Sequence, residues 1–137
     1  MLGAEHAMVV HSDDGLDEIS IAAATHVTEL RDGSIESYQI SPEDFSLEPQ
    51  DLQGLSVASV GASADLIRRA LSPDDDPVAR KASAMLALNA GATIYVSGIA
   101  ATLADGVAIA EDALASGLAA EKLSQFVDFT QMMRGQG

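Results

Sequence analysis

The sequence predicts an α/β fold in which one short strand and a β-hairpin are followed by about four helices. Three observations support this prediction. Residues 7–11 are a short apolar run of the kind that a buried parallel strand shows. The dipeptide 32–33 is Asp-Gly and separates two strand-like segments, which is a strong hairpin signal. From about residue 60 the chain is rich in alanine and carries helix caps.

The first strand is preceded by Gly3, which suits the C-terminal cap of a helix. Only Met1 and Leu2 stand before this glycine, so the chain is expected to begin inside a helix-to-strand unit and to be a fragment. An acidic loop, residues 12–18, follows the strand and holds four carboxylates around a glycine.

The hairpin is expected to pair residues 25–30 with residues 35–40. If the Asp-Gly dipeptide forms the turn, Glu29 lies opposite Glu36, and such a like-charge pair is destabilising. A wider loop would relieve the repulsion, so the pattern leaves the register open.

Helical structure is predicted from residue 41 onward. Residues 41–45 form a capped turn with serine at the cap and proline at the first position. A helix over 63–71 is expected to end at Pro73. The next helix begins with Asp76 as its cap and runs over 77–98.

Two further helices complete the prediction. Small residues over 82–101 permit close approach of neighbouring elements. Thr102 caps the third helix and Gly117 lies beyond its end. The last helix, 119–133, is expected to dock on the others through an apolar stripe. That stripe consists of Leu123, Phe126, Val127, Thr130 and Met133.

Length, cysteine content and net charge limit the kinds of protein that this chain can be. With 137 residues the chain holds at most one domain, here a single partial domain with a strand part (1–60) and a helical part (61–137). The lack of cysteine favours the cytoplasm. A net charge of -14 argues against nucleic acid as a partner, and no apolar run is long enough for a membrane helix.

The acidic loop is the candidate site, because adjacent carboxylates on an irregular loop can bind a hard cation such as Mg²⁺. Asp17 and Glu18 are the predicted metal ligands. The alternative is a solvated loop with Asp13 as a turn former. The three histidines lack metal-ligand spacing, and no catalytic or cofactor-binding residue is predicted. These histidines are His6, His11 and His26.

Ordered segments of the chain resemble the later part of the anthranilate phosphoribosyltransferase family. They are residues 2–12, 14–20, 25–33, 40–45, 88–91, 95–98 and 103–108. The resemblance implies the C-terminal part of a nucleoside phosphorylase/phosphoribosyltransferase-like α/β domain. Family members transfer phosphoribose from phosphoribosyl pyrophosphate to anthranilate in tryptophan biosynthesis, with Mg²⁺ as cofactor.

The family's Asp-Glu metal pair matches Asp17 and Glu18. Its N-terminal helical domain and the first half of its α/β domain, with a glycine-rich phosphate loop, are absent. The resemblance therefore implies a transferase fragment that is inactive alone, derived from a homodimeric parent. Exposed sheet edges and faces are expected to make the fragment self-associate.

Two other functions stay open. The charge and the missing phosphate loop also suit a non-enzymatic cation-binding or interaction module derived from this fold. A different member of the same superfamily, such as a nucleoside phosphorylase or a nucleic-acid-binding relative, is disfavoured by the acidity and by residues 14–18.

Overall fold

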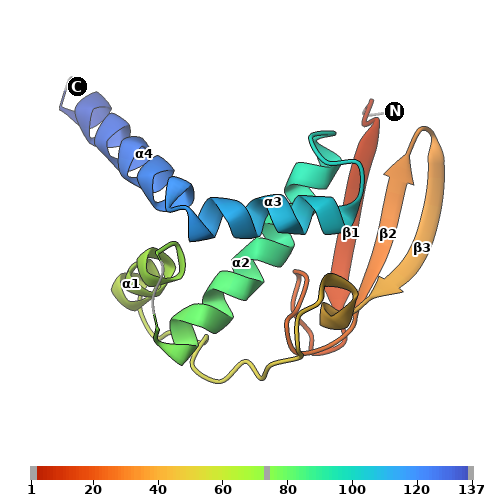
Figure 1. Ribbon diagram of the computed structural model, residues 1–137. Coiled ribbons are helices and arrows are strands. Elements are labelled where there is room, and N and C mark those ends of the chain that lie inside the picture. Colours follow the sequence, from red (N-terminus) through yellow and green to blue (C-terminus); the bar gives the residue numbers. More distant parts are fainter. Residues whose placement is uncertain (1–2, 73–74, 136–137) are drawn as a thin grey trace.

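The computed structural model describes residues 3–72 and 75–135 and combines a small sheet with helices on one side (Figure 1). Met1 and Leu2, the expected helix remnant, and Pro73, the expected helix stop, lie outside the described residues. The strands, in spatial order, are β1 (His6–Ser12), β2 (Thr25–Arg31) and β3 (Ser34–Ile40). The expected strand, hairpin and four α-helices are all present. That the chain is a single partial domain stays a prediction.

The expectation of a buried parallel first strand is wrong for the described sheet. β1 pairs antiparallel with β2, with His6 opposite Arg31 and Ser12 opposite Thr25. A parallel pair needs a long crossover, whereas β2 here follows β1 after a loop that reverses the chain. Only one face of β1 meets the core, and Val9 on the other face is 70% exposed.

The hairpin turn is formed by Asp32 and Gly33, at φ values of 50° and 78°. Positive φ at both positions matches the right-handed twist of the flanking strands. Glu29 lies opposite Glu36, so no wider loop separates the two. Hydrogen bonds to the Glu29 carboxylate offset the repulsion between the two charges instead.

The helices agree closely with the predicted caps. Ser59 begins α1 one turn earlier than expected, because its side chain accepts a hydrogen bond from the Ala62 N–H. Asp76 and Thr102 cap the next two helices as predicted. The observed elements are η1 (Pro42–Phe45), α1 (Val60–Ala70), α2 (Pro77–Val96), α3 (Leu103–Ala115) and α4 (Leu118–Arg134).

α2 and α3 cross closely over the inner face of the sheet (Figure 1). At the crossing, a Cβ on Gly91 would lie 2.6 Å from the Cα of Val107, so the position has room only for glycine. The close approach expected from the small residues is therefore present. Leu88 and Val107 share one buried core cluster with Ile19, Ile21, Val27 and Ile40.

The expectation that α4 docks on the other helices is wrong. α4 has no buried residue and extends away from the rest of the molecule (Figure 1). Leu123 and Val127 line a cavity of about 310 Å³ toward the end of α1, while Phe126 and Phe129 are 64% and 58% exposed. Some apolar residues of α4 thus face the cavity and others face solvent, and none of them is buried. No helix within 3–72 and 75–135 is long and apolar enough to cross a membrane.

Candidate metal site

The acidic loop begins where β1 ends and is held by a compact set of hydrogen bonds. Both oxygens of the Asp14 carboxylate accept, one from the Ser12 hydroxyl and one from the Ser20 hydroxyl at 2.6 Å. Ser12 and Ser20 are fully buried. Burial alone would raise the pKa of Asp14, but these hydrogen bonds outweigh it and the pKa is lowered. Asp14 is therefore a charged structural acceptor.

The predicted ligands, Asp17 and Glu18, are the last two residues of this loop. Asp17 is exposed, and Glu18 is half-buried beside an apolar cavity of about 200 Å³. Burial, and then the nearby charge of Asp17, raise the pKa of Glu18. A cation bound to this carboxylate pair (Asp17 and Glu18) would offset the repulsion between the two charges.

The residue that follows the carboxylate pair, Ile19, is held by α2. The N–H of Ile19 donates to Oδ1 of Asn89 at 2.9 Å, and Nδ2 of Asn89 donates to the Ile19 carbonyl at 2.9 Å. Sequence reasoning missed this role of Asn89 and the role of Asp14. Only Asp14 left a local signal, as a carboxylate between Ser12, which ends β1, and Gly15.

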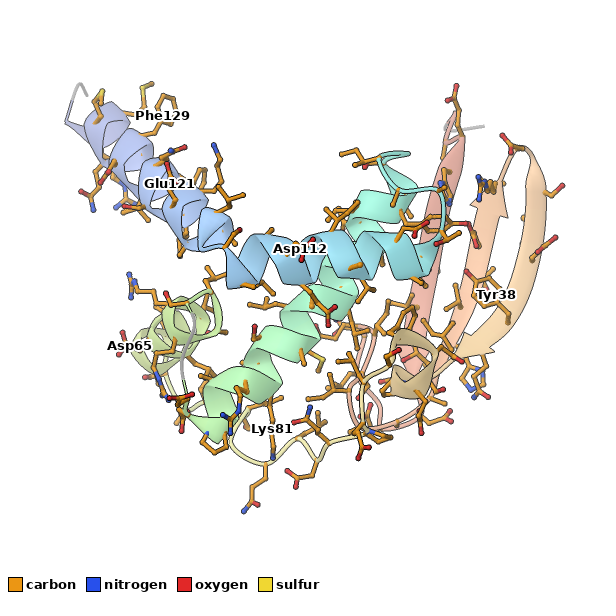
Figure 2. All side chains as sticks on the ribbon, in the orientation of Figure 1. Tyr38, Asp65, Lys81, Asp112, Glu121 and Phe129 are labelled. Carbon is orange, nitrogen blue, oxygen red and sulfur yellow. The ribbon has the colours of Figure 1, made fainter. Side chains whose placement is uncertain are left out.

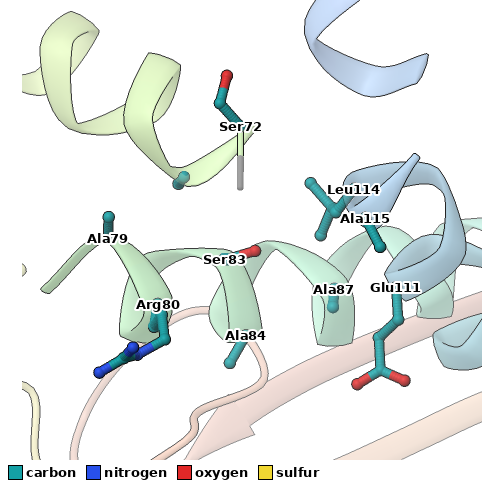
Figure 3. Close-up of a pocket in the computed structure, with 10 residues that line it drawn as sticks. Ser72, Ala79, Arg80, Ser83, Ala84, Ala87, Glu111, Leu114 and Ala115 are labelled. Carbon is teal, nitrogen blue, oxygen red and sulfur yellow. The ribbon is translucent and has the colours of Figure 1, made fainter. Parts of the chain in front are cut away.

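A larger cavity lies elsewhere, between α1, α2 and α3 (Figure 3). Its volume is about 440 Å³, and alanines form much of its wall, with Arg80 and Glu111 as the charged lining residues. Neither member of the carboxylate pair lines it. The chemistry of the loop, and not cavity size, identifies the candidate site.

Two of the three histidines bond to carboxylates. His6 pairs with Glu29 at 2.7 Å, and His26 pairs with Asp13 at 2.8 Å on the exposed face of the sheet. Across residues 3–72 and 75–135, no group of three or more histidine or carboxylate side chains is placed to hold a metal ion. A cation at the loop would therefore take its remaining ligands from water or from a bound anion.

Comparison with known proteins places the chain in a family. A model described as the a/b domain of the glycosyl transferase family matches residues 1–120. The chain belongs to this glycosyl transferase family.

Relatives of the chain are anthranilate phosphoribosyltransferases. An anthranilate phosphoribosyltransferase of Saccharophagus degradans is 54% identical over 131 residues, which cover 96% of this chain and 38% of the relative. The crystal structure of the Thermus thermophilus anthranilate phosphoribosyltransferase has a TM-score of 0.78 and 31% identity, covering 92% of this chain and 36% of that one. The resemblance and the fold class predicted from the sequence are confirmed.

A third relative shows the same fold. It is the Saccharomyces cerevisiae anthranilate phosphoribosyltransferase in complex with PRPP and Mg, with a TM-score of 0.64 and 23% identity over 88% of this chain and 34% of that one. The chain spans 38% of the length of the curated relatives it matches.

Proposed function

We propose that this chain is the C-terminal part of an anthranilate phosphoribosyltransferase and supplies the metal-binding edge of its active site. The whole enzyme transfers phosphoribose from phosphoribosyl pyrophosphate to anthranilate. The observation that carries the proposal is 54% identity to an enzyme of this name over 96% of the chain. Because that match covers 38% of the relative, the chain alone is expected to have negligible turnover.

The carboxylate pair suits Mg²⁺ by its donor chemistry. Mg²⁺ is usually held by one or two carboxylates, with waters and substrate phosphates completing its ligands. Asp17 and Glu18 are two adjacent oxygen donors, one exposed and one half-buried. When bound, the ion would neutralise charge on the departing pyrophosphate.

The net charge of -14 gives the pair a second role. An acidic chain repels a pyrophosphate, so substrate is expected to reach this face together with a cation. The yeast enzyme of the same fold is described with both PRPP and Mg, which supports the proposal. The cytoplasmic location and the homodimeric parent stay predictions.

The test of the metal site is a charge-matched pair of variants. Asp17→Asn/Glu18→Gln is expected to abolish Mg²⁺ binding measured by calorimetry. Asp65→Asn/Glu121→Gln makes the same change of charge on α1 and α4 (Figure 2) and is expected to preserve it. Equal binding by both variants would reject the carboxylate pair.

The alternative, a non-enzymatic cation-binding module, predicts the same binding result. Joining this chain to the N-terminal part of the Saccharophagus degradans relative separates the two functions. The transferase proposal expects Mg²⁺-dependent consumption of anthranilate by the joined protein. A folded chimera without turnover would favour the binding module.

A further inference from the structure

The side chain of Asn89 bonds to the backbone of Ile19 in the way that a neighbouring strand would. Its side chain bonds to both backbone groups of Ile19, each at 2.9 Å, and its Nδ2 also donates to the Met85 carbonyl at 3.0 Å within α2. Ile19 directly follows Glu18 and lies 70 positions before Asn89. The helix therefore fixes the backbone immediately after the carboxylate pair.

Ile19 depends on this contact. Its side chain is 2% exposed and belongs to the core with Leu88 and Val107. Buried backbone N–H and C=O groups need hydrogen-bond partners. Within the part of the chain that the structure describes, Asn89 is the partner for both groups of Ile19.

The other side of the pair is anchored as well. The N–H of Leu16 donates to the Ser12 hydroxyl at 3.1 Å, and the N–H of Ser12 donates to the Leu16 carbonyl at 3.1 Å. Asp17 and Glu18 thus lie between two fixed points, Leu16 and Ile19. With both ends held, the backbone that carries the two carboxylates is fixed.

We propose that Asn89 is a positioning residue that holds Asp17 and Glu18 in the arrangement needed to bind one cation. In a regular strand, adjacent side chains point to opposite faces, so convergence requires a defined irregular backbone. Partners that orient metal ligands without touching the metal commonly change its affinity by about 10-fold to 100-fold. This inference rests on the proposed function of the carboxylate pair.

The experiment measures Mn²⁺ affinity of the 137-residue chain by calorimetry, with Mn²⁺ as a probe for the Mg²⁺ site. Asn89→Ala is expected to weaken binding on the order of 10-fold. The matched control is Tyr95→Phe, which removes hydrogen bonds to Glu29 and Arg31 from the other end of α2. It is expected to lower stability and leave the affinity unchanged.

A second variant and a second readout cover a loss of folding. Asn89→Ser replaces the carboxamide with a shorter hydroxyl that can bond to one Ile19 group through a water, and it is expected to give a smaller loss of affinity than alanine. Hydrogen exchange at the Ile19 amide is expected to accelerate in both Asn89 variants and to stay slow in Tyr95→Phe.

The outcomes separate this inference from the proposed function. If Asp17→Asn/Glu18→Gln abolishes Mn²⁺ binding while the folded Asn89 variants bind as tightly as Tyr95→Phe, the positioning role is overturned and the metal pair stands. If the double variant binds like the unsubstituted chain, or if the unsubstituted chain does not bind, the metal pair itself is rejected.

Discussion

The phenol of Tyr95 donates a hydrogen bond of 2.8 Å to the carboxylate of Glu29. Glu29 is 8% exposed, and its carboxylate also accepts from Tyr38 at 2.6 Å and pairs with His6 at 2.7 Å. Tyr95 in turn accepts from Arg31 at 2.8 Å. One buried carboxylate thereby joins all three strands to α2.

Replacing Glu29 is expected to destabilise the chain strongly. In Glu29→Gln, the amide cannot accept every hydrogen bond that the carboxylate accepts, and a buried donor left without a partner is costly. The expected loss in the free energy of unfolding is about 2 kcal/mol, measured by urea denaturation. Glu36→Gln is the control, since Glu36 lies opposite on the hairpin but is exposed; a change within about 0.5 kcal/mol is expected there.

The same carboxylate predicts a pH dependence. Burial would raise the pKa of Glu29, but the hydrogen bonds from Tyr38, Tyr95 and His6 outweigh it, so the pKa lies below its usual value of 4.5. The unfolded chain then binds the proton more tightly, so the stabilisation is complete above pH 4.5 and is lost as the pH falls through the lowered pKa.

Unfolding curves of the unsubstituted chain and Glu29→Gln test this dependence between neutral and acidic pH. The difference between the two is expected to shrink as the pH falls below the usual pKa of a glutamate. A difference that stays constant over this range would contradict the assignment.

The crossing of α2 and α3 predicts a large effect at one glycine. An added Cβ at Gly91 would meet the backbone of Val107, which cannot move aside as a side chain could. Gly91→Ala is expected to cost about 3 kcal/mol in thermal or urea unfolding, because overpacking outweighs the better helix propensity of alanine. Gly61→Ala in α1 has open space and is expected to stabilise by about 0.5 kcal/mol. Equal effects of the two substitutions would argue against the close crossing.

Local signals in the sequence predicted most of the fold. The Asp76 and Thr102 caps and the Asp32-Gly33 turn depend on residues close in the chain, and all are present. Contacts over long separations left no such signal. The bonds from Asn89 to Ile19 and from Tyr95 to Glu29 span 70 and 66 positions.

The candidate site likewise combines residues with a local signal and a long-range contact without one. The acidic pattern pointed to Asp17 and Glu18, but nothing local indicated which helix would hold the loop. For α4, the periodicity of apolar residues predicted a docked helix, because a pattern shows which face is apolar and not whether a partner is present.

The predicted self-association is expected to use α4. Its outer face exposes Phe126, Phe129 and Met133, which together form an apolar patch on a helix without buried residues. α4 carries two acidic and two basic residues, so it is locally neutral in a chain of net charge -14 and is the least repelled by a second copy.

Phe126→Gln/Phe129→Gln is expected to shift the chain toward monomer in sedimentation velocity. The free energy of unfolding of the monomer is expected to change by less than about 0.5 kcal/mol, because neither side chain is buried. Ile35→Gln is the control, since Ile35 is 71% exposed but lies on β3. If Ile35→Gln disperses the oligomer and the phenylalanine variant does not, association occurs through the sheet and not through α4.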